Sequence, residues 1–385
     1  MKFTVNKSNL FKKLVPAMGA VSNKNTITSI EGVLIETLSD NKIQISTYDM
    51  NKGFRAIIDA VSIERDGKFI INAQRLFQTI KVLPDDDITF DVNDKLNCEI
   101  TCENASFSMF ALRGADFPNL PELVTEKGFN VSSELLKKMI SKVSHSIAEQ
   151  DNRPMLCGAF FKIKKGLIQA VSCDGYTLSK CSSECEIKSL ADDGAIEYSF
   201  IIPGHALSEI SKIVSDSEEE EVSVYLSRKH AIIKKEDIVF FTRTIDSDYI
   251  DYERIIPKEN DIIVAIDRDR LLSGLERANI IAEEKIQGSG RSYVKIGIKG
   301  QVFSLSSSSI NGGVSDEMSC VHEGSDIEIG FNCRYLINSV RATEGETLNI
   351  TLKTPNQAIT IEPTEEEDGF KSFFMILPVR MNENK

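Results

Sequence analysis

One residue pattern occurs three times in the chain, and this repetition constrains the fold more than any other feature of the sequence. In each copy, two apolar residues at alternate positions are followed by apolar residues at offsets 7 and 11. That spacing is typical of a short strand that enters an amphipathic helix. The copies begin at Phe3, Phe129 and Val264, which are 126 and 135 residues apart. The candidate N-caps of the three helices are Ser8, Ser132 or Ser133, and Asp267 or Asp269.

A second anchor of the same kind follows 65 to 71 residues later in every copy. It begins at Phe69, Phe200 and Ile329, and a leucine lies seven residues after each. Alternating strand patterns, such as residues 348–352, come next. The pattern predicts an α+β fold with three repeated domains, each of which packs two helices on one side of antiparallel sheets.

Pro-bearing stretches separate the copies and predict where the domains meet. They cover residues 115–123 and 255–261. We therefore expect domains at 1–126, 127–260 and 261–385. Pro16 lies inside the first helical pattern, where it should kink the helix or end it early.

Positive charge is concentrated on the expected helices. The whole chain has a formal charge of −13, whereas the six helical segments together carry +9. Solvated basic helix faces are common, so this asymmetry alone is ambiguous. If the equivalent helices share one surface, their lysines and arginines form a basic wall that attracts phosphates without reading bases. The cations of this wall would be Lys12, Lys13, Arg75, Lys81, Lys137, Lys138, Lys142, Arg334 and Arg341.

The sequence carries few signals of catalysis, metal binding or membrane insertion. Eight cysteines without a signal peptide indicate reduced thiols, and the Cys181 and Cys185 pair lacks the companions of a zinc site. The Gly-Ser-Gly-Arg segment at 288–291 lacks the arrangement of a phosphate loop. No apolar stretch is long enough for a membrane span. We expect a cytoplasmic protein with no cofactor, no metal and no membrane partner.

The order of short motifs resembles the bacterial DNA polymerase III β subunit along essentially the whole chain. The matching stretches are MKFTV at 1–5, ADFPNLP at 115–121, QDNR at 150–153, SCDGYTL at 172–178, DYERIIP at 251–257, GFNCRYL at 330–336 and LPVRM at 377–381. Any one of these is weak evidence, but seven in the right order are specific.

The resemblance implies a non-catalytic sliding clamp, a head-to-tail homodimer whose six domains close a ring around duplex DNA. Processivity would then follow from topology, so contacts with DNA can stay weak and independent of sequence. Family positions imply a dimer interface at Arg75, Thr79, Phe107, Met109, Ile280 and Ile281. They also imply DNA-facing loops at Lys24 and Gln150, with Lys81 on a lining helix. Lys24 replaces an expected arginine, which keeps the charge but loses the bidentate fork.

The resemblance further implies an apolar groove that binds short extended peptides of the polymerase III catalytic subunit, the clamp loader and other clamp-binding proteins. Departures from the family pattern at Ile250, Met155 and Asn356 bear on which peptides the groove prefers. The groove residues would be Met155, Leu156, Cys173, Gly175, Tyr176, Leu178, Arg254, Ile255, Asn332, Tyr335, Met375, Leu377, Pro378, Val379, Arg380 and Met381.

Two other functional classes are alternatives to a clamp. One is an enzyme of unrecognised type with dispersed carboxylates, and the other is a repeat scaffold that binds only proteins. Retention on nicked circular DNA that is lost when the circle is linearised distinguishes a clamp from both, because only an encircling protein responds to DNA ends.

Overall fold

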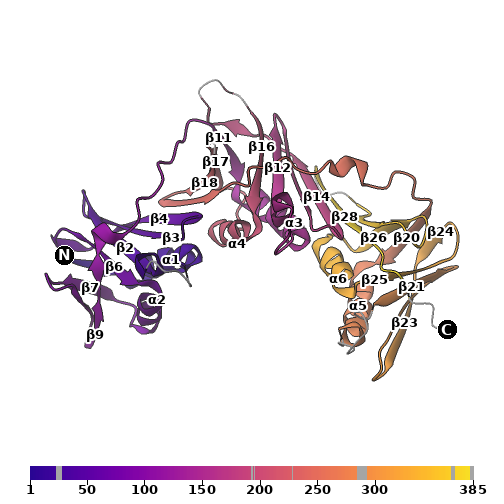
Figure 1. Ribbon diagram of the computed structural model, residues 1–385, viewed down its shortest axis with the longest axis horizontal. Coiled ribbons are helices and arrows are strands. Elements are labelled where there is room, and N and C mark those ends of the chain that lie inside the picture. The colour runs from indigo at the N-terminus through magenta and orange to yellow at the C-terminus, as the bar shows by residue number, and fades with distance from the viewer. Residues whose placement is uncertain are drawn as a thin grey trace. The chain divides into compact units, whose positions relative to one another are not determined.

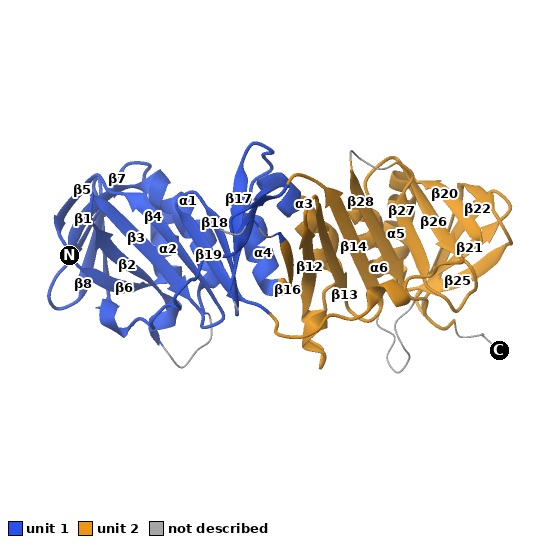
Figure 2. Ribbon diagram, turned by 90° about the horizontal axis from the view of Figure 1, so that it is seen from above, with its two compact units in different colours: residues 1–137, 187–196, 205–244 blue, residues 138–186, 197–204, 245–385 orange. Residues whose placement is uncertain are grey.

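The computed structural model describes residues 1–22, 28–191, 194, 196–227, 229–283, 293–365 and 369–381. The chain forms two compact units (Figure 2). Unit 1 contains residues 1–137, 187–196 and 205–244, and unit 2 contains residues 138–186, 197–204 and 245–385. The middle of the chain therefore contributes strands to both units. Lys24 and the segment 288–291 lie outside the described residues.

Unit 1 is built on two antiparallel sheets (Figure 1). The first has the order β5 (Ser62–Arg65), β1 (Lys2–Asn6), β7 (Asp87–Val92), β8 (Asn97–Cys102) and β9 (Ala105–Phe110). The second begins with β10 (Leu112–Arg113), β6 (Lys68–Asn72), β2 (Gly32–Leu38), β3 (Lys42–Tyr48) and β4 (Lys52–Asp59). It continues through β19 (Ile238–Arg243), β18 (His230–Lys235), β17 (Glu221–Leu226), β11 (Gly128–Ser132) and β15 (Lys188–Ser189).

Unit 2 also contains two antiparallel sheets. One begins with β16 (Glu197–Pro203), β12 (Gly158–Lys164), β13 (Leu167–Cys173) and β14 (Thr177–Glu184). It continues through β28 (Phe370–Ile376), β27 (Ile359–Pro363), β26 (Thr347–Leu352), β20 (Ile262–Asp267) and β24 (Val321–Glu323). The other has the order β23 (Gly313–Ser319), β22 (Val302–Ser308), β21 (Val294–Lys299) and β25 (Ile327–Phe331).

The described helices occupy the predicted positions. They are α1 (Lys7–Ala17), α2 (Ala73–Val82), α3 (Ser133–Val143), α4 (Gly204–Ile213), α5 (Arg268–Ala282) and α6 (Cys333–Ala342), together with short 3₁₀ helices at Met18–Ala20, Thr28–Glu31, Gly114–Asp116, Ser144–Ser146, Pro154–Cys157 and Tyr252–Arg254. The predicted Pro16 effect is confirmed, because α1 ends one residue later and a 3₁₀ turn follows. The prediction of Ser8 as an N-cap is wrong, since Asn6 accepts the hydrogen bond from the Asn9 amide. Asp267 caps α5 as predicted.

The order of the main elements is the same in all three repeats. Each has a strand, a helix, five strands, a second helix and three strands, and the first repeat adds the two-residue strand β10 at its end, which confirms the predicted α+β repeat. The apolar anchors Phe3, Phe129 and Val264 are fully buried at equivalent places. Burial of a side chain of this size stabilises the fold by about 1.5–3 kcal/mol, so the repeated pattern marks the core of every repeat.

Each sheet that joins two repeats uses the same pair of edge strands. In unit 1 the fourth strand of the first repeat, β4, pairs with the ninth strand of the second, β19, as in Ala56 opposite Ile238. In unit 2 the fourth strand of the second repeat, β14, pairs with the ninth strand of the third, β28, as in Leu178 opposite Met375. Two strands of these kinds remain at sheet edges within the described chain, namely β9 and β23.

Candidate functional site

A tight hairpin between β13 and β14 carries the first of the predicted groove residues. The Asp174 carboxylate accepts hydrogen bonds from the amides of Tyr176 and Thr177. Gly175 has a φ of +89°, a backbone conformation that favours glycine. This turn holds the Tyr176 ring in solvent, where 61% of the residue is exposed. Asp174 and Gly175 therefore form the turn of this hairpin.

An apolar cluster lies beneath this hairpin. Leu156, Cys173, Leu178 and Met375 are buried in it, so these four predicted groove residues form a base. Met155 and Ile250 pack on it, although both depart from the family pattern. Asn356, the third departure, is exposed. Sequence analysis missed the members Phe160, Val171, Tyr249, Tyr252 and Ala358.

The missed aromatic residues are held together by ring contacts. Phe160 stacks on Tyr249 with ring centroids 5.1 Å apart, and Tyr249 meets Tyr252 edge-on at 6.4 Å. Lys180 lies over the Tyr252 ring and forms an ion pair with Glu253 at 2.7 Å. These contacts fix the 3₁₀ turn that presents Arg254 and Ile255 at the surface. The alternation of buried and partly exposed residues along β12 gives Phe160 a partly exposed position. It does not indicate that Phe160 stacks on Tyr249, which is about 90 residues away.

The C-terminal segment is attached at two points. The Leu377 amide donates to the Tyr176 carbonyl, and the Val379 amide donates to the Gly330 carbonyl, both at 2.9 Å. Met381 lies against Gly330, where a β-carbon would come within 2.8 Å of the Met381 Cγ. Pro378 and Arg380 alternate with these contacts, and Arg380 is exposed. The segment therefore crosses from the β13–β14 hairpin to β25.

Helix α6 supplies the remaining predicted groove residues. The Asn332 side chain caps it by accepting a hydrogen bond from the Arg334 amide. Tyr335, in the first turn, stacks on Tyr176 with centroids 6.1 Å apart. We call the exposed parts of Tyr176, Arg254, Ile255, Tyr335, Leu377, Val379, Arg380 and Met381 the candidate binding surface.

Two arginine–aspartate pairs lie in or beside the candidate binding surface. Arg153 forms two side-chain hydrogen bonds to Asp151, and these bonds hold the pKa of that carboxyl down at about 2. Arg254 pairs with Asp251 at 2.7 Å, although 85% of its side chain is exposed. Exposed pairs of this kind contribute little to stability. Both guanidinium groups can therefore turn toward a bound carboxylate or carbonyl group.

The predicted DNA-facing cations fall into two classes. Lys12, Arg75 and Lys81 are exposed, Lys13 is half-buried, and none has a carboxylate partner among the described residues. The other five are engaged within the protein. Their contacts are Lys137 with Asp216 at 2.6 Å, Lys138 with Glu344 at 3.0 Å, Lys142 with Glu344 at 2.7 Å, Arg334 with Glu283, and Arg341 with Glu276 at 2.7 Å. Gln150 is exposed in the loop after α3.

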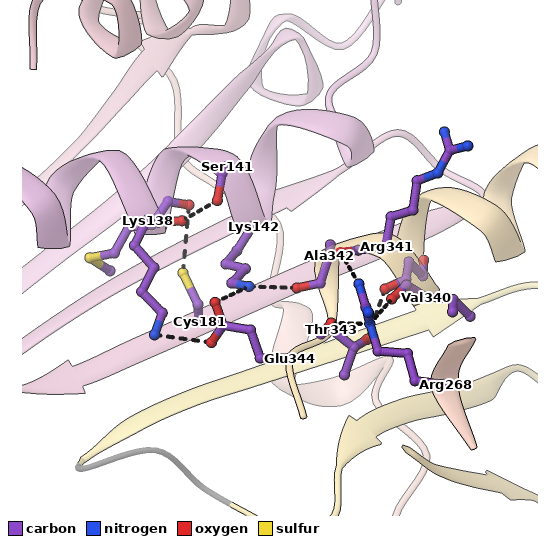
Figure 3. A network of polar contacts seen from close by, with 12 residues as sticks. Lys138, Ser141, Lys142, Cys181, Arg268, Val340, Arg341, Ala342, Thr343 and Glu344 are labelled. Atoms are coloured by element: carbon purple, nitrogen blue, oxygen red, sulfur yellow. Dashed lines mark hydrogen bonds and ion pairs between the residues drawn. The ribbon is translucent and has the colours of Figure 1, made fainter. Parts of the chain in front are cut away.

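Lys142 differs from the other cations because its side chain is only 7% exposed. Its Nζ donates to the Ala342 carbonyl and to Glu344 Oε1, so it is poorly placed to meet phosphate (Figure 3). Helix periodicity alone could not predict this, since the acceptors come from residues about 200 positions later.

The predicted interface residues lie in the first and third repeats. Phe107 and Met109 are on the edge strand β9, and 36% of Phe107 is exposed. Arg75 is exposed on α2, but Thr79 is only 6% exposed. In α5, Ile280 is 71% exposed and Ile281 is half-buried. Apolar side chains this exposed on a helix and an edge strand are typical of a contact surface.

Family models of the DNA polymerase III beta subunit match the chain in three parts. The N-terminal domain model covers residues 1–121, the central domain model 130–251 and the C-terminal domain model 253–380. The chain belongs to the DNA polymerase III beta subunit family.

Full-length relatives and solved structures agree with this assignment. The beta sliding clamp of Bacillus subtilis is 25% identical over 99% of this chain and 100% of the relative, and that of Pseudomonas putida is 25% identical with the same coverage. The crystal structure of the Bacillus subtilis clamp has a TM-score of 0.89 at 23% identity, over 99% of this chain and 100% of that one. A Pseudomonas aeruginosa clamp bound to griselimycin has a TM-score of 0.88 at 22% identity, with the same coverage. These two structures show that the fold is shared.

No helix among the described residues is long and apolar enough to cross a membrane. The same residues contain no group of three or more His, Cys, Asp or Glu that could hold a metal ion.

Proposed function

We propose that this chain is a sliding clamp, a non-catalytic processivity factor that encircles duplex DNA as a head-to-tail homodimer. The observation that carries the proposal is the pair of open sheet edges. Both junctions between repeats join a fourth strand to a ninth strand, and the first and third repeats each leave one strand of these kinds at a sheet edge, β9 and β23. A second copy can supply the missing partner at each end, so two chains close a ring.

Unpaired strand edges are a liability in a monomer, because their amides and carbonyls bind other strands. Pairing β23 of one copy with β9 of the other removes both edges. Phe107, Met109 and Ile280, which flank these edges, would then be covered. The proposed interface therefore explains why apolar groups are exposed at these places.

We propose that Lys12, Lys13 and Lys81 attract the DNA backbone, together with Gln150 and Lys24. Lys12, Lys13 and Lys81 have no carboxylate partner in the described chain. Contacts of this type neutralise phosphates without reading the base sequence. A closed ring stays on DNA without high affinity, because it cannot dissociate sideways. Lys137, Lys138, Arg334 and Arg341 contribute less in this proposal, because nearby carboxylates already balance their charges.

We propose that the candidate binding surface receives short extended peptides from the polymerase III catalytic subunit, the clamp loader and other clamp-binding proteins. An apolar base with exposed aromatic and arginine side chains suits a few apolar anchors and a polar backbone. Griselimycin, the compound bound in the Pseudomonas aeruginosa clamp structure, should bind here and compete with such peptides. Clamps of this kind act on chromosomal DNA, so the proposed location is the cytoplasm.

The clamp proposal is tested on DNA with and without ends. The chain is loaded onto a nicked circular plasmid with a clamp loader, and bound protein is measured after gel filtration at moderate salt. We expect stable retention on the circle and release after a restriction enzyme linearises it. Equal retention on both forms would contradict encirclement and favour a conventional DNA-binding scaffold.

A further inference from the structure

The C-terminal end of α6 is capped by side chains from three different places in the chain (Figure 3). The last four carbonyls of a helix have no partners within the helix, and cations near them also interact favourably with the helix dipole. Here all four are satisfied. The donors are Thr343 to Ser339, Arg268 to Val340 and Arg341, and Lys142 to Ala342.

Lys142 makes this cap a contact between repeats. It lies at the end of α3, in the second repeat, whereas α6 belongs to the third. Its Nζ donates to the Ala342 carbonyl and to Glu344 Oε1, both at 2.7 Å. Lys138, one helical turn earlier, pairs with the other carboxylate oxygen at 3.0 Å. We call Lys138, Lys142 and Glu344 the α3–α6 latch.

Burial makes the latch more costly to break than an ordinary surface ion pair. The Lys142 side chain is 7% exposed and the Glu344 side chain 32% exposed. Partial burial raises the pKa of Glu344, but hydrogen bonds from Lys142 and Lys138 outweigh it and leave the pKa below its usual value. Removing one partner of such a group leaves the other charge partly desolvated and unpaired, so the contact is costly to break.

The opposite end of the same helix reaches the candidate binding surface. Asn332 caps α6 there, and Tyr335 in its first turn stacks on Tyr176 of the second repeat. A helix of ten residues is about 15 Å long. Helix α6 thus touches the second repeat at both ends, through the latch at one and the tyrosine stack at the other.

We propose that Lys142 and Glu344 are positioning residues for the candidate binding surface, an inference that rests on its proposed peptide-binding function. The latch fixes the C-terminal end of a rigid helix against α3, and this fixes where Tyr335 stands relative to Tyr176. Without the latch, α6 samples other positions, and only a fraction of molecules presents the surface in its binding arrangement. Apparent affinity falls in proportion to that fraction.

The experiment compares Lys142→Met and Glu344→Gln with the wild type in stopped-flow and calorimetric binding of griselimycin. Both substitutions remove a charge and nearly preserve shape. We expect the association rate to fall about tenfold while the dissociation rate changes less than twofold, because the bound complex keeps the same contacts. The double variant should bind no more weakly than the weaker single variant, since both break one contact. Lys138→Met keeps the bond from Lys142 to Ala342 and should lose less.

Amide hydrogen exchange supplies a second measurement on the same variants. Faster exchange in the last turn of α6 is expected, with unchanged exchange in β1 and β7. An unchanged association rate in folded variants would overturn the inference. If Lys142→Met fails to fold, Glu344→Gln alone decides the question, because Glu344 is partly exposed and the change is isosteric. Failure of the wild-type chain to bind griselimycin would instead contradict the proposed binding function.

Discussion

The ring of Tyr176 stacks on the ring of Tyr335, with centroids 6.1 Å apart and an angle of 22° between the planes. The first tyrosine comes from a hairpin of the second repeat and the second from a helix of the third. Because 61% of Tyr176 is exposed, its ring is available to a ligand as well as to Tyr335. Tyr176 can therefore be substituted without removing a side chain from the hydrophobic core.

Substitution of Tyr176 tests the role of this pair. Tyr176→Ala removes both the stack and an exposed apolar face, and an aromatic pair contributes about 0.5–1.5 kcal/mol beyond the area that it buries. We expect griselimycin affinity to fall about tenfold or more by calorimetry, with the thermal midpoint within about 2 °C of wild type. Tyr176→Phe keeps the ring and should bind normally. Unchanged affinity in Tyr176→Ala would place the ligand elsewhere.

Met381→Ala tests the other side of the surface. The side chain lies against Gly330 at the end of the C-terminal segment and is half-buried. Truncation should weaken griselimycin binding by about 1–2 kcal/mol, in the range found for contact residues of moderate importance. Sedimentation velocity should show an unchanged oligomer. Loss of the oligomer with intact ligand binding would show that this segment belongs to the interface between subunits.

The repeated architecture could be predicted from sequence because it depends on local periodicity. Phe3, Phe129 and Val264 are anchors that any strand–helix pattern reveals, and all are buried as their spacing required. The partners of the helix cations could not be predicted in this way. Glu344 meets Lys138 and Lys142 from a distant repeat, so a charge count along each helix treats both lysines as available when neither is.

The sequence predicted the exposed residues of the candidate binding surface but missed several residues of the apolar cluster beneath them. Its residues were assigned through a family resemblance carried by short motifs, which contain surface positions such as Tyr176 and Arg254. The base includes Phe160 and Tyr249, which lie outside those motifs and meet only through the folding of two distant segments. The spacing of residues along one sequence does not show which side chains from distant segments stack on each other.

The proposed dimer is tested by a charge at Ile280, the most exposed of the apolar residues predicted for its interface. Ile280→Asp places an unpaired carboxylate where the partner's β9 region would cover it, which is unfavourable because a buried charge needs a partner. We expect the dimer dissociation constant to rise at least about tenfold, equivalent to 1.4 kcal/mol, by analytical ultracentrifugation. Val61→Asp is the matched control, since Val61 is 54% exposed and lies beside β5, the strand at the opposite edge of the sheet from β9. A similar effect of both substitutions would argue against this interface.

His145 predicts how stability depends on pH. Burial, and then the nearby Lys142, lower the pKa of His145 from 6.5 to about 4. Its ring lies 5.5 Å from Phe374, and its Nε2 is 3.1 Å from the Ser179 hydroxyl. The unfolded chain therefore binds a proton between pH 6.5 and 4 that the folded chain does not. Stability should fall as pH decreases through this window, by up to about 3 kcal/mol at 1.4 kcal/mol per pKa unit.

Urea unfolding at a series of pH values measures this dependence. In His145→Gln, the decrease that begins near pH 6.5 should be smaller, because only His205 and His230, whose pKa values are also lowered by burial, still contribute to it. The decrease below about pH 4.5 should persist. That lower window belongs to carboxyl groups such as Glu344 and Asp151, whose lowered pKa values contribute stability at neutral pH that is lost on protonation. An identical pH profile in wild type and His145→Gln would contradict the assignment.

The salt dependence of DNA binding tests which lysines meet phosphate. Each phosphate contact that is lost should reduce the slope of log Kd against log salt by about 0.9 for duplex DNA. The triple variant Lys12→Gln, Lys13→Gln, Lys81→Gln should therefore lower the slope by about 2 to 3. A control with the same change in net charge is Lys42→Gln, Lys68→Gln, Lys95→Gln, whose lysines lie on strands and turns of the same repeat. If DNA responds only to total charge, both triple variants lose affinity equally, and the three helix lysines have no special role. We expect DNA affinity to fall only in the first triple variant. Lys142→Met should bind DNA like the wild type, because the Lys142 ammonium group already donates to Ala342 and Glu344.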